Sequence, residues 1–240
     1  MSQIDLTDLA RKNGGSTRLS GYLATPSGAG PWPGVVVIHE ALGLNDVVRR
    51  QADRLAEAGY LALAVDLFSA GGVRKCLVST MRSLWKGEGT PFADIESARE
   101  WLISSENCTG NVGVIGFCMG GSFALATANT GFDASSVNYG FLPRDLDAAL
   151  AGACPIVASY GGRDLPLRSV PAKLERALTK AGIPHDVKQY QSAGHSFLND
   201  SEIGPQPVRV IMRIAGMGPQ PGAAADAWQR IETFFGEHLR

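Results

Sequence analysis

Short apolar runs alternate along this chain with longer segments in which apolar residues recur every three or four positions. At residues 34–38, four consecutive β-branched side chains follow a glycine, with no polar residue among them. A run that is apolar at every position is typical of a strand buried on both faces of a sheet. We expect strands at residues 34–38, 60–65, 111–116, 153–160 and 186–190.

The segments between these runs show helical periodicity. Val48, Ala52 and Leu55 share one face of residues 45–58, and Gly59 provides a natural stop. Repeated strand–helix–strand units predict an α/β fold with a mostly parallel central sheet and helices on both faces. Because no segment has the composition of an interdomain linker, we expect one domain over residues 1–240. Helices are expected at residues 45–58, 92–103, 120–130, 170–181 and 223–238.

A local repeat marks residues 200–222. The sequence Gly-Pro-Gln-Pro at 204–207 recurs at 218–221, and the segment between the two copies contains Ile211, Met212 and Ile214. Two proline-rich hinges around a short apolar segment predict either a lid over a site or a surface insertion held down by its apolar face. In the first case, these three side chains are candidates to face a substrate.

The composition of the chain argues against several classes of function. The chain has 22 Lys+Arg and 23 Asp+Glu without a basic run, which argues against nucleic-acid binding through phosphate neutralisation. No apolar run reaches the roughly 18 residues of a membrane span, and the N-terminus lacks the apolar core of a signal peptide, so we expect a cytoplasmic protein that does not bind membranes. Four separated cysteines without a CxxC pair predict neither disulfides nor a metal site. We expect no cofactor.

The clearest chemical signal is Gly116-Phe117-Cys118-Met119-Gly120-Gly121, between an expected strand and a helix of small residues. This is the context of a nucleophile elbow, a tight turn whose flanking positions must be nearly free of side chains. The nucleophile is then Cys118, at a helix N-terminus that favours a thiolate. The alternative is a buried cysteine in a glycine-rich turn.

A cysteine nucleophile needs a base, and the base needs an orienting acid. Asp164 and His195 follow the last two expected strands, so they lie at the same edge of the sheet as Cys118. The order Cys118, Asp164, His195 is that of nucleophile, acid and base in α/β hydrolases. His39 ends the strand at 34–38, where it either lines the pocket or has a structural role.

Glu40 follows the same strand and is costly to bury without a partner. It borders the loop that normally supplies the second donor of an oxyanion hole. The alternative interpretation of Glu40 is a simple surface carboxylate or a charge at a helix N-terminus.

These residues together resemble the dienelactone hydrolase family from about Ser20 to Arg240. The resemblance depends on Val36-Val37-Ile38-His39-Glu40 with Gly43, Gly116-Phe117-Cys118-Met119-Gly120-Gly121, Gly161-Gly162-Arg163-Asp164 and Gly194-His195-Ser196-Phe197. It implies an α/β-hydrolase fold and a Cys118-His195-Asp164 triad that opens the ester of a dienelactone. It also implies that Glu40 contacts and activates the thiol, and that the N–H groups of Met119 and Ala41 form the oxyanion hole.

The resemblance also suggests the substrate contacts. We expect Trp85, Arg82, Ser196 and Phe197 to bind substrate. The family has an arginine just after the His-Ser-Phe stretch, whereas this chain has Leu198-Asn199-Asp200. Because Asp200 would repel an anion, we expect neutral short-chain esters or uncharged lactones to be turned over better than dienelactone.

The leading hypothesis is therefore a hydrolase of small carboxylic esters or lactones that acts through an acyl-enzyme intermediate. A thioesterase or polymer esterase on the same scaffold fits the sequence equally well. The alternative from another class is a non-catalytic or redox-sensing protein in which Cys118 is an oxidisable thiol. We expect no partner beyond the small-molecule substrate, and a monomer or weak homodimer.

Overall fold

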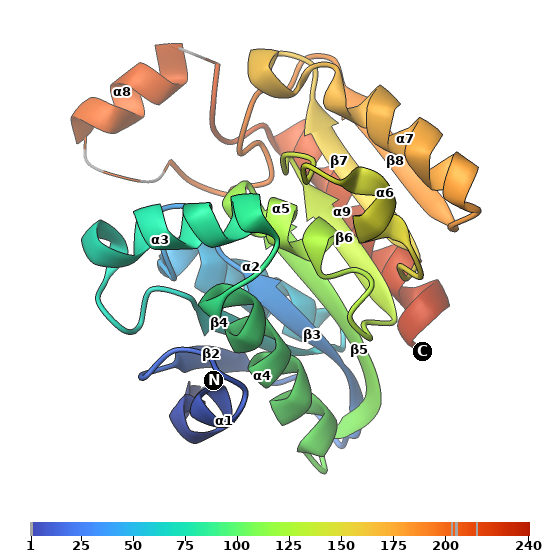
Figure 1. Ribbon diagram of the computed structural model, residues 1–240. Helices are drawn as coiled ribbons and strands as arrows, with labels where there is room; N and C mark the ends of the chain where they lie inside the picture. Colours follow the sequence, from blue (N-terminus) through green and yellow to red (C-terminus); the bar gives the residue numbers. More distant parts are fainter. Residues whose placement is uncertain (1, 203, 205, 215) are drawn as a thin grey trace.

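The architecture is a single twisted sheet with helices on both faces (Figure 1). The computed structural model describes residues 2–202, 204, 206–214 and 216–240, without the side chains of Val208, Ile211 and Ile214. Eight strands follow the order β1-β2-β4-β3-β5-β6-β7-β8. The bounds are β1 Ser2–Asp5, β2 Ser20–Ala24, β3 Trp32–Ile38, β4 Leu61–Asp66, β5 Cys108–Phe117, β6 Ala134–Asn138, β7 Ile156–Gly161 and β8 His185–Tyr190.

Strand β2 pairs antiparallel with β1 and β4, and every other pairing in this sheet is parallel. This confirms the expected mostly parallel α/β fold. The five expected strands correspond to β3, β4, β5, β7 and β8. The sequence reading missed β6 because Ser135 and Ser136 interrupt its apolar pattern. Both serines are fully buried, and Ser135 Oγ donates to the Ala124 carbonyl at 2.9 Å, which offsets the cost of burying the hydroxyl.

The helices divide between the two faces. Helices α4 and α5 pack on one face, and α2 and α9 pack on the other, where Arg54 of α2 pairs with Glu232 of α9 at 2.9 Å. The expected helices correspond to α2, α4, α5, α7 and α9. The bounds are α1 Thr7–Lys12, α2 Asp46–Glu57, α3 Val73–Lys86, α4 Thr90–Ser104, α5 Met119–Ala126, α6 Leu146–Leu150, α7 Val170–Ala181, α8 Gln206–Ile214 and α9 Pro221–Leu239, with a 3₁₀ turn at Leu165–Leu167.

No helix in the described ranges is long and apolar enough to cross a membrane. The core lies between the sheet and its two helix layers, and residues 35–38 of β3 are completely buried. The parallel strands β3, β5, β6, β7 and β8 all end at one edge of the sheet. In an open α/β sheet this edge forms the ligand crevice, so the loops that leave these five strands hold the candidate site.

Candidate active site

Cys118 occupies a strained turn between β5 and α5. Its φ is 55°, a left-handed conformation that costs energy for a residue with a side chain. The turn requires glycine on both sides: a Cβ at Gly116 would clash with the Gly120 carbonyl, and one at Gly120 would clash with the carbonyl of Ile38. The turn therefore holds the half-buried Cys118 side chain just before the first residue of α5.

His195 and Asp164 form a close pair next to this turn. Nδ1 of His195 lies 2.5 Å from Oδ2 of Asp164, and both residues are buried. Burial by itself lowers the pKa of His195. Hydrogen bonding and charge interactions with Asp164 and Cys118 outweigh the effect of burial and raise the pKa to about 10. His195 is thus set up to hold a proton beside the Cys118 sulfur.

The Glu40 carboxyl group is buried near the His195–Asp164 pair, and uncharged side chains donate hydrogen bonds to it. Ser196 Oγ donates to Glu40 Oε1 at 3.0 Å, and Asn199 Nδ2 lies 3.3 Å from Oε2. Burial raises the pKa of Glu40, although these donors and the charge of His195 oppose the shift. Ser196 has a φ of 59°, so the loop after β8 bends sharply to bring its hydroxyl to Glu40.

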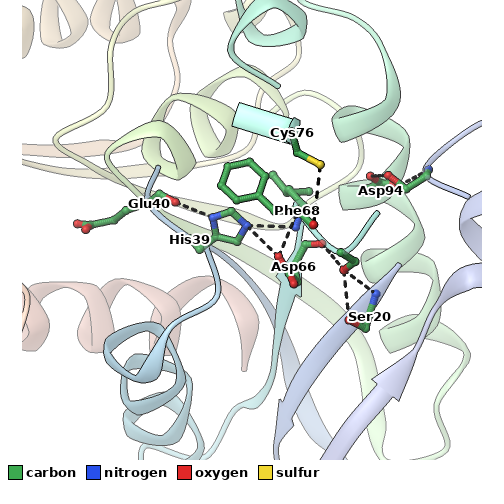
Figure 2. Close-up of polar contacts among 10 residues, drawn as sticks. Ser20, His39, Glu40, Asp66, Phe68, Cys76 and Asp94 are labelled. Carbon is green, nitrogen blue, oxygen red and sulfur yellow. Dashed lines mark hydrogen bonds and ion pairs between the residues drawn. The ribbon is translucent and has the colours of Figure 1, made fainter. Parts of the chain in front are cut away.

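His39 has a structural role, which decides between the two sequence-based alternatives. The ring is fully buried; Nδ1–H donates to the Glu40 carbonyl at 2.7 Å and Nε2 accepts the Leu67 N–H at 3.1 Å. Burial lowers the pKa of His39, so the ring is neutral with its proton on Nδ1. Figure 2 shows the Glu40 side chain pointing away from the His39 ring, so only its backbone is tied to this histidine.

Tyr139 is a site residue that the sequence reading missed. It follows β6 with a φ of 42°, and its ring lies 5.0 Å from the His195 ring and 5.7 Å from the Phe197 ring. Burial and the charges of Glu40 and Cys118 raise its pKa well above the usual value. Its hydroxyl is buried without a hydrogen-bond partner in the part of the chain that the structure describes. The missed strand β6 is the reason that this position could not be found.

The expected oxyanion donors lie where the sequence analysis put them along the chain. Met119 is the first residue of α5, so its N–H has no acceptor within the helix. Ala41 lies in the turn after Glu40, which is closed by a hydrogen bond of 3.0 Å from Gly43 N–H to the Glu40 carbonyl. Gly120 packs against the end of β3, so the start of α5 and the Ala41 turn are adjacent.

Comparison with known proteins identifies the family to which this chain belongs. A model of the dienelactone hydrolase family matches residues 19–239. The chain belongs to the dienelactone hydrolase family. It is 28% identical over 238 residues to a carboxymethylenebutenolidase of Rhodococcus opacus, covering 91% of this chain and 86% of that protein. The family assignment supports a hydrolase.

Solved structures show the same fold as this dienelactone hydrolase family member. A dienelactone hydrolase-like promiscuous phosphotriesterase from metagenomic libraries superposes with a TM-score of 0.83 at 26% identity, covering 100% of this chain and 98% of the other. A dienelactone hydrolase from Anabaena variabilis gives a TM-score of 0.72 at 22% identity, with the same coverage of both chains.

Two cavities open near the His195–Asp164 pair and the start of α5. One, of about 350 Å³, is lined by Asp164 and His195, with Met217 and Phe141 at its sides. The other, of about 290 Å³, is lined by Trp85 and also by Phe141. Trp85 thus faces a cavity as expected. The other expected substrate contacts do not line either cavity.

Their positions explain this difference. Arg82 is exposed on α3. Phe197 is completely buried against Tyr139 and Tyr190, and the buried Ser196 is bonded to Glu40. In this structure Ser196 and Phe197 hold the loop that carries His195 instead of facing open space.

The 200–222 insertion is tied down at both ends. At its start, Asp200 forms an ion pair with Arg50 of α2, with Arg50 Nη2 lying 2.8 Å from Asp200 Oδ1. This ion pair compensates the negative charge of Asp200, which weakens the basis for expecting it to repel an anionic substrate. The side chains of Ile211 and Ile214, which we considered as substrate contacts, lie outside the described residues.

The end of the insertion runs along the loop that carries the histidine. Gly218 N–H donates to the His195 carbonyl at 2.8 Å, and Gln220 N–H donates to the Phe197 carbonyl at 3.1 Å. A Cβ at Gly194 would clash with the Gly216 carbonyl. No group of three or more potential metal ligands lies among the described residues.

Proposed function

We propose that this protein hydrolyses small carboxylic esters or lactones with Cys118 as its nucleophile. The proposal depends on one observation. The strained turn that holds Cys118 lies next to the buried pair in which His195 Nδ1 is 2.5 Å from Asp164 Oδ2. Carboxymethylenebutenolidase activity on a dienelactone, as the name of the Rhodococcus relative states for that protein, is one member of this class.

The first half-reaction forms an acyl enzyme. His195 takes the thiol proton of Cys118, and Asp164 stabilises the resulting imidazolium. The thiolate attacks the carbonyl carbon, and the N–H groups of Met119 and Ala41 hold the oxyanion. Collapse of this intermediate breaks the bond to the alcohol oxygen, which takes the proton from His195 and leaves the acyl group on sulfur.

The second half-reaction restores the enzyme. His195 removes a proton from water, and the hydroxide oxygen attacks the thioester carbonyl. Collapse then breaks the carbon–sulfur bond, releasing the carboxylic acid and the Cys118 thiolate, which pairs again with protonated His195.

Glu40 fits this scheme as a carboxyl group near the thiol. An ionised carboxylate there would oppose thiolate formation, because two negative charges would share a buried site. Burial raises the pKa of Glu40, which disfavours a second negative charge next to an ion pair between Cys118 and His195. We assign Glu40 this activating role.

A pair of cysteine variants tests the proposal. Cys108 begins β5 and Cys118 follows its last residue, so the two half-buried thiols lie at opposite ends of one strand. We expect Cys118→Ala to lose turnover of p-nitrophenyl acetate and Cys108→Ala to retain it, with circular dichroism confirming that both fold. Iodoacetamide should inactivate the wild type and Cys108→Ala alike.

Turnover by folded Cys118→Ala at the wild-type rate would contradict the nucleophile assignment. A wild type that hydrolyses none of a panel of aryl esters, thioesters and lactones, but in which peroxide reversibly oxidises Cys118, would instead favour the redox-sensing alternative. Cys118→Ser should retain some turnover, because a Ser-His-Asp arrangement is itself competent.

A further inference from the structure

A buried amide on α2 contacts the loop that carries His195. Gln51 lies on the inner face of α2, where its neighbours Val48 and Ala52 are apolar and buried. Gln51 is only 5% exposed, and its Nε2 group donates to Asn199 Oδ1 at 3.1 Å. This glutamine therefore joins two segments that are 148 residues apart in the sequence.

Packing alone does not account for this amide. Gln51 Oε1 is buried and has no hydrogen-bond partner among the described residues. Burying a polar atom without a partner costs free energy, which an apolar side chain of similar length would avoid. The contact that Gln51 does make, with Asn199, is therefore the feature to explain.

This contact decides which end of the Asn199 amide faces Glu40. Asn199 is 3% exposed, and its Oδ1 atom accepts the hydrogen bond from Gln51. Its Nδ2 group is consequently turned toward Glu40 and lies 3.4 Å from Oε1 and 3.3 Å from Oε2. In the opposite orientation Asn199 would present an oxygen to the carboxyl group, which an ionised carboxylate repels. Gln51 thus selects the orientation that stabilises the ionised form of Glu40.

Two loops bring titratable groups to the Glu40 carboxyl group. Burial raises the pKa of Glu40, and the charge of His195, in the loop after β8, opposes the rise. Tyr139, in the loop after β6, has its own pKa raised by burial and then by the charge of Glu40. His39, which precedes Glu40 in the chain, bonds only its backbone carbonyl. On α2, Arg50 forms its ion pair at the surface.

Charge on Glu40 bears on the reactivity of Cys118. After burial, the charges of Glu40 and Cys118 are the next causes that raise the pKa of Tyr139, so both groups lie near this one side chain. Two negative charges in a buried site disfavour each other, so an ionised Glu40 opposes formation of the Cys118 thiolate. The Asn199 orientation that Gln51 selects therefore restrains Cys118.

We propose that Gln51 is a positioning residue for the nucleophile and that it acts through Asn199 on the charge of Glu40. Gln51 itself lines neither of the two cavities near the site. The inference takes Cys118 as the nucleophile from the function proposed above and adds what tunes its reactivity. Loss of the Gln51 contact makes Glu40 less ionised, so we expect it to make Cys118 more reactive.

Alkylation of Cys118 as a function of pH tests the proposal without any substrate. Iodoacetamide reacts with the thiolate, so the pH midpoint of its reaction reports where the thiolate forms. Mass spectrometry of the peptide that contains Cys118 distinguishes it from the other cysteines. We expect Gln51→Met to lower this midpoint by about half a pH unit, so that below the midpoint Cys118 reacts about threefold faster than in wild type.

Arg50→Met is the matched control. Arg50 is the preceding residue on α2, and its ion pair with Asp200 is a second tie between this helix and the same loop. The substitution removes that tie but leaves the donors to Glu40 in place. We therefore expect the alkylation midpoint of Arg50→Met to equal that of wild type.

A double variant tests whether Gln51 acts through Asn199. Adding Gln51→Met to Asn199→Ala should leave the midpoint of Asn199→Ala unchanged, because the amide that Gln51 orients is already absent. Circular dichroism and thermal unfolding check that each variant folds. Gln51→Leu serves in place of Gln51→Met if the latter does not fold.

The outcomes separate this inference from the proposed function. An unchanged or raised midpoint in the folded Gln51 variant overturns the inference, as does an equal shift in Arg50→Met, which would assign the effect to anchoring of the loop in general. A further shift in the double variant with Asn199→Ala overturns it as well. These results leave the ester-hydrolase function standing, because that function is tested by turnover. If esters are not turned over but the midpoint shifts only in the Gln51 variant, the hydrolase function fails and the tuning of Cys118 remains.

Discussion

His39 and His195 are buried at the same edge of one sheet, yet their surroundings shift the pKa values of the two imidazole rings in opposite directions. His39, at the end of β3, bonds two backbone groups and lies 3.7 Å from the Asp66 carboxylate, yet burial lowers its pKa. His195, in the loop after β8, faces Asp164 and Cys118, and its pKa rises to about 10. Burial disfavours the charged form in both cases. The difference lies in the partners, because only His195 meets two groups that carry negative charge.

This comparison distinguishes the histidine with structural contacts from the one proposed to act in catalysis by the partners of each ring. A ring whose two nitrogens bond one carbonyl and one N–H is fixed in one neutral tautomer and cannot shuttle protons. A ring between a carboxylate and a thiol can alternate between neutral and charged forms. The substitutions below break one histidine's environment at a time.

Among substitutions around the two histidines, the largest expected effect on turnover comes from His195→Ala. Without the base, Cys118 keeps its proton and the leaving alcohol receives none, so we expect the acylation rate to fall on the order of 10²-fold or more. Burst kinetics with p-nitrophenyl acetate measures this step. Thermal unfolding should confirm that the variant folds. A rate within a few-fold of wild type would mean that another group serves as base.

Asp164→Asn should lower the rate somewhat less, since it misorients the ring without removing it. It should also change the pH dependence of stability. Because the folded-state pKa of His195 is raised, its pairing stabilises the fold fully below the unfolded-state value of 6.5 and is lost as pH rises through about 10. We expect the free energy of unfolding of wild type to exceed that of Asp164→Asn at pH 6 and the gap to shrink toward pH 10, as measured by urea titration. A gap that stays constant over this range would show that His195 is not charged in the folded protein.

His39→Gln should have the smallest effect on turnover. Glutamine keeps an acceptor for Leu67 but loses the Nδ1 donor to Glu40, so we expect a loss of about 1–3 kcal/mol in stability and less than a tenfold change in kcat. The pH trend should be the reverse of that for Asp164→Asn. The folded-state pKa of His39 is lowered, so its contribution is lost as pH falls below 6.5, and the gap to the variant should shrink toward acid. A collapse of kcat with unchanged stability would instead place His39 in the chemistry.

Local patterns were sufficient to predict much of this protein. The β-branched run of β3 and the glycines around Cys118 are short segments whose meaning depends on their own residues, and both were placed from the sequence. Residues whose role depends on partners far away in the sequence could not be predicted from local patterns. Tyr139 follows a strand masked by serines, and the Arg50–Asp200 pair joins positions 150 residues apart, so no local pattern reveals either.

The two ends of the 200–222 insertion are anchored by different chemistry, which bears on how the segment can vary. At the Asp200 end the anchor is a side-chain ion pair, which any exchange of Arg50 or Asp200 would alter. At the other end the anchors are main-chain bonds from Gly218, whose φ of 119° favours glycine, and from Gln220, whose N–H any residue except proline could supply. An added or deleted residue at 216–220 would therefore shift His195 itself, because these main-chain bonds fix the spacing to its loop.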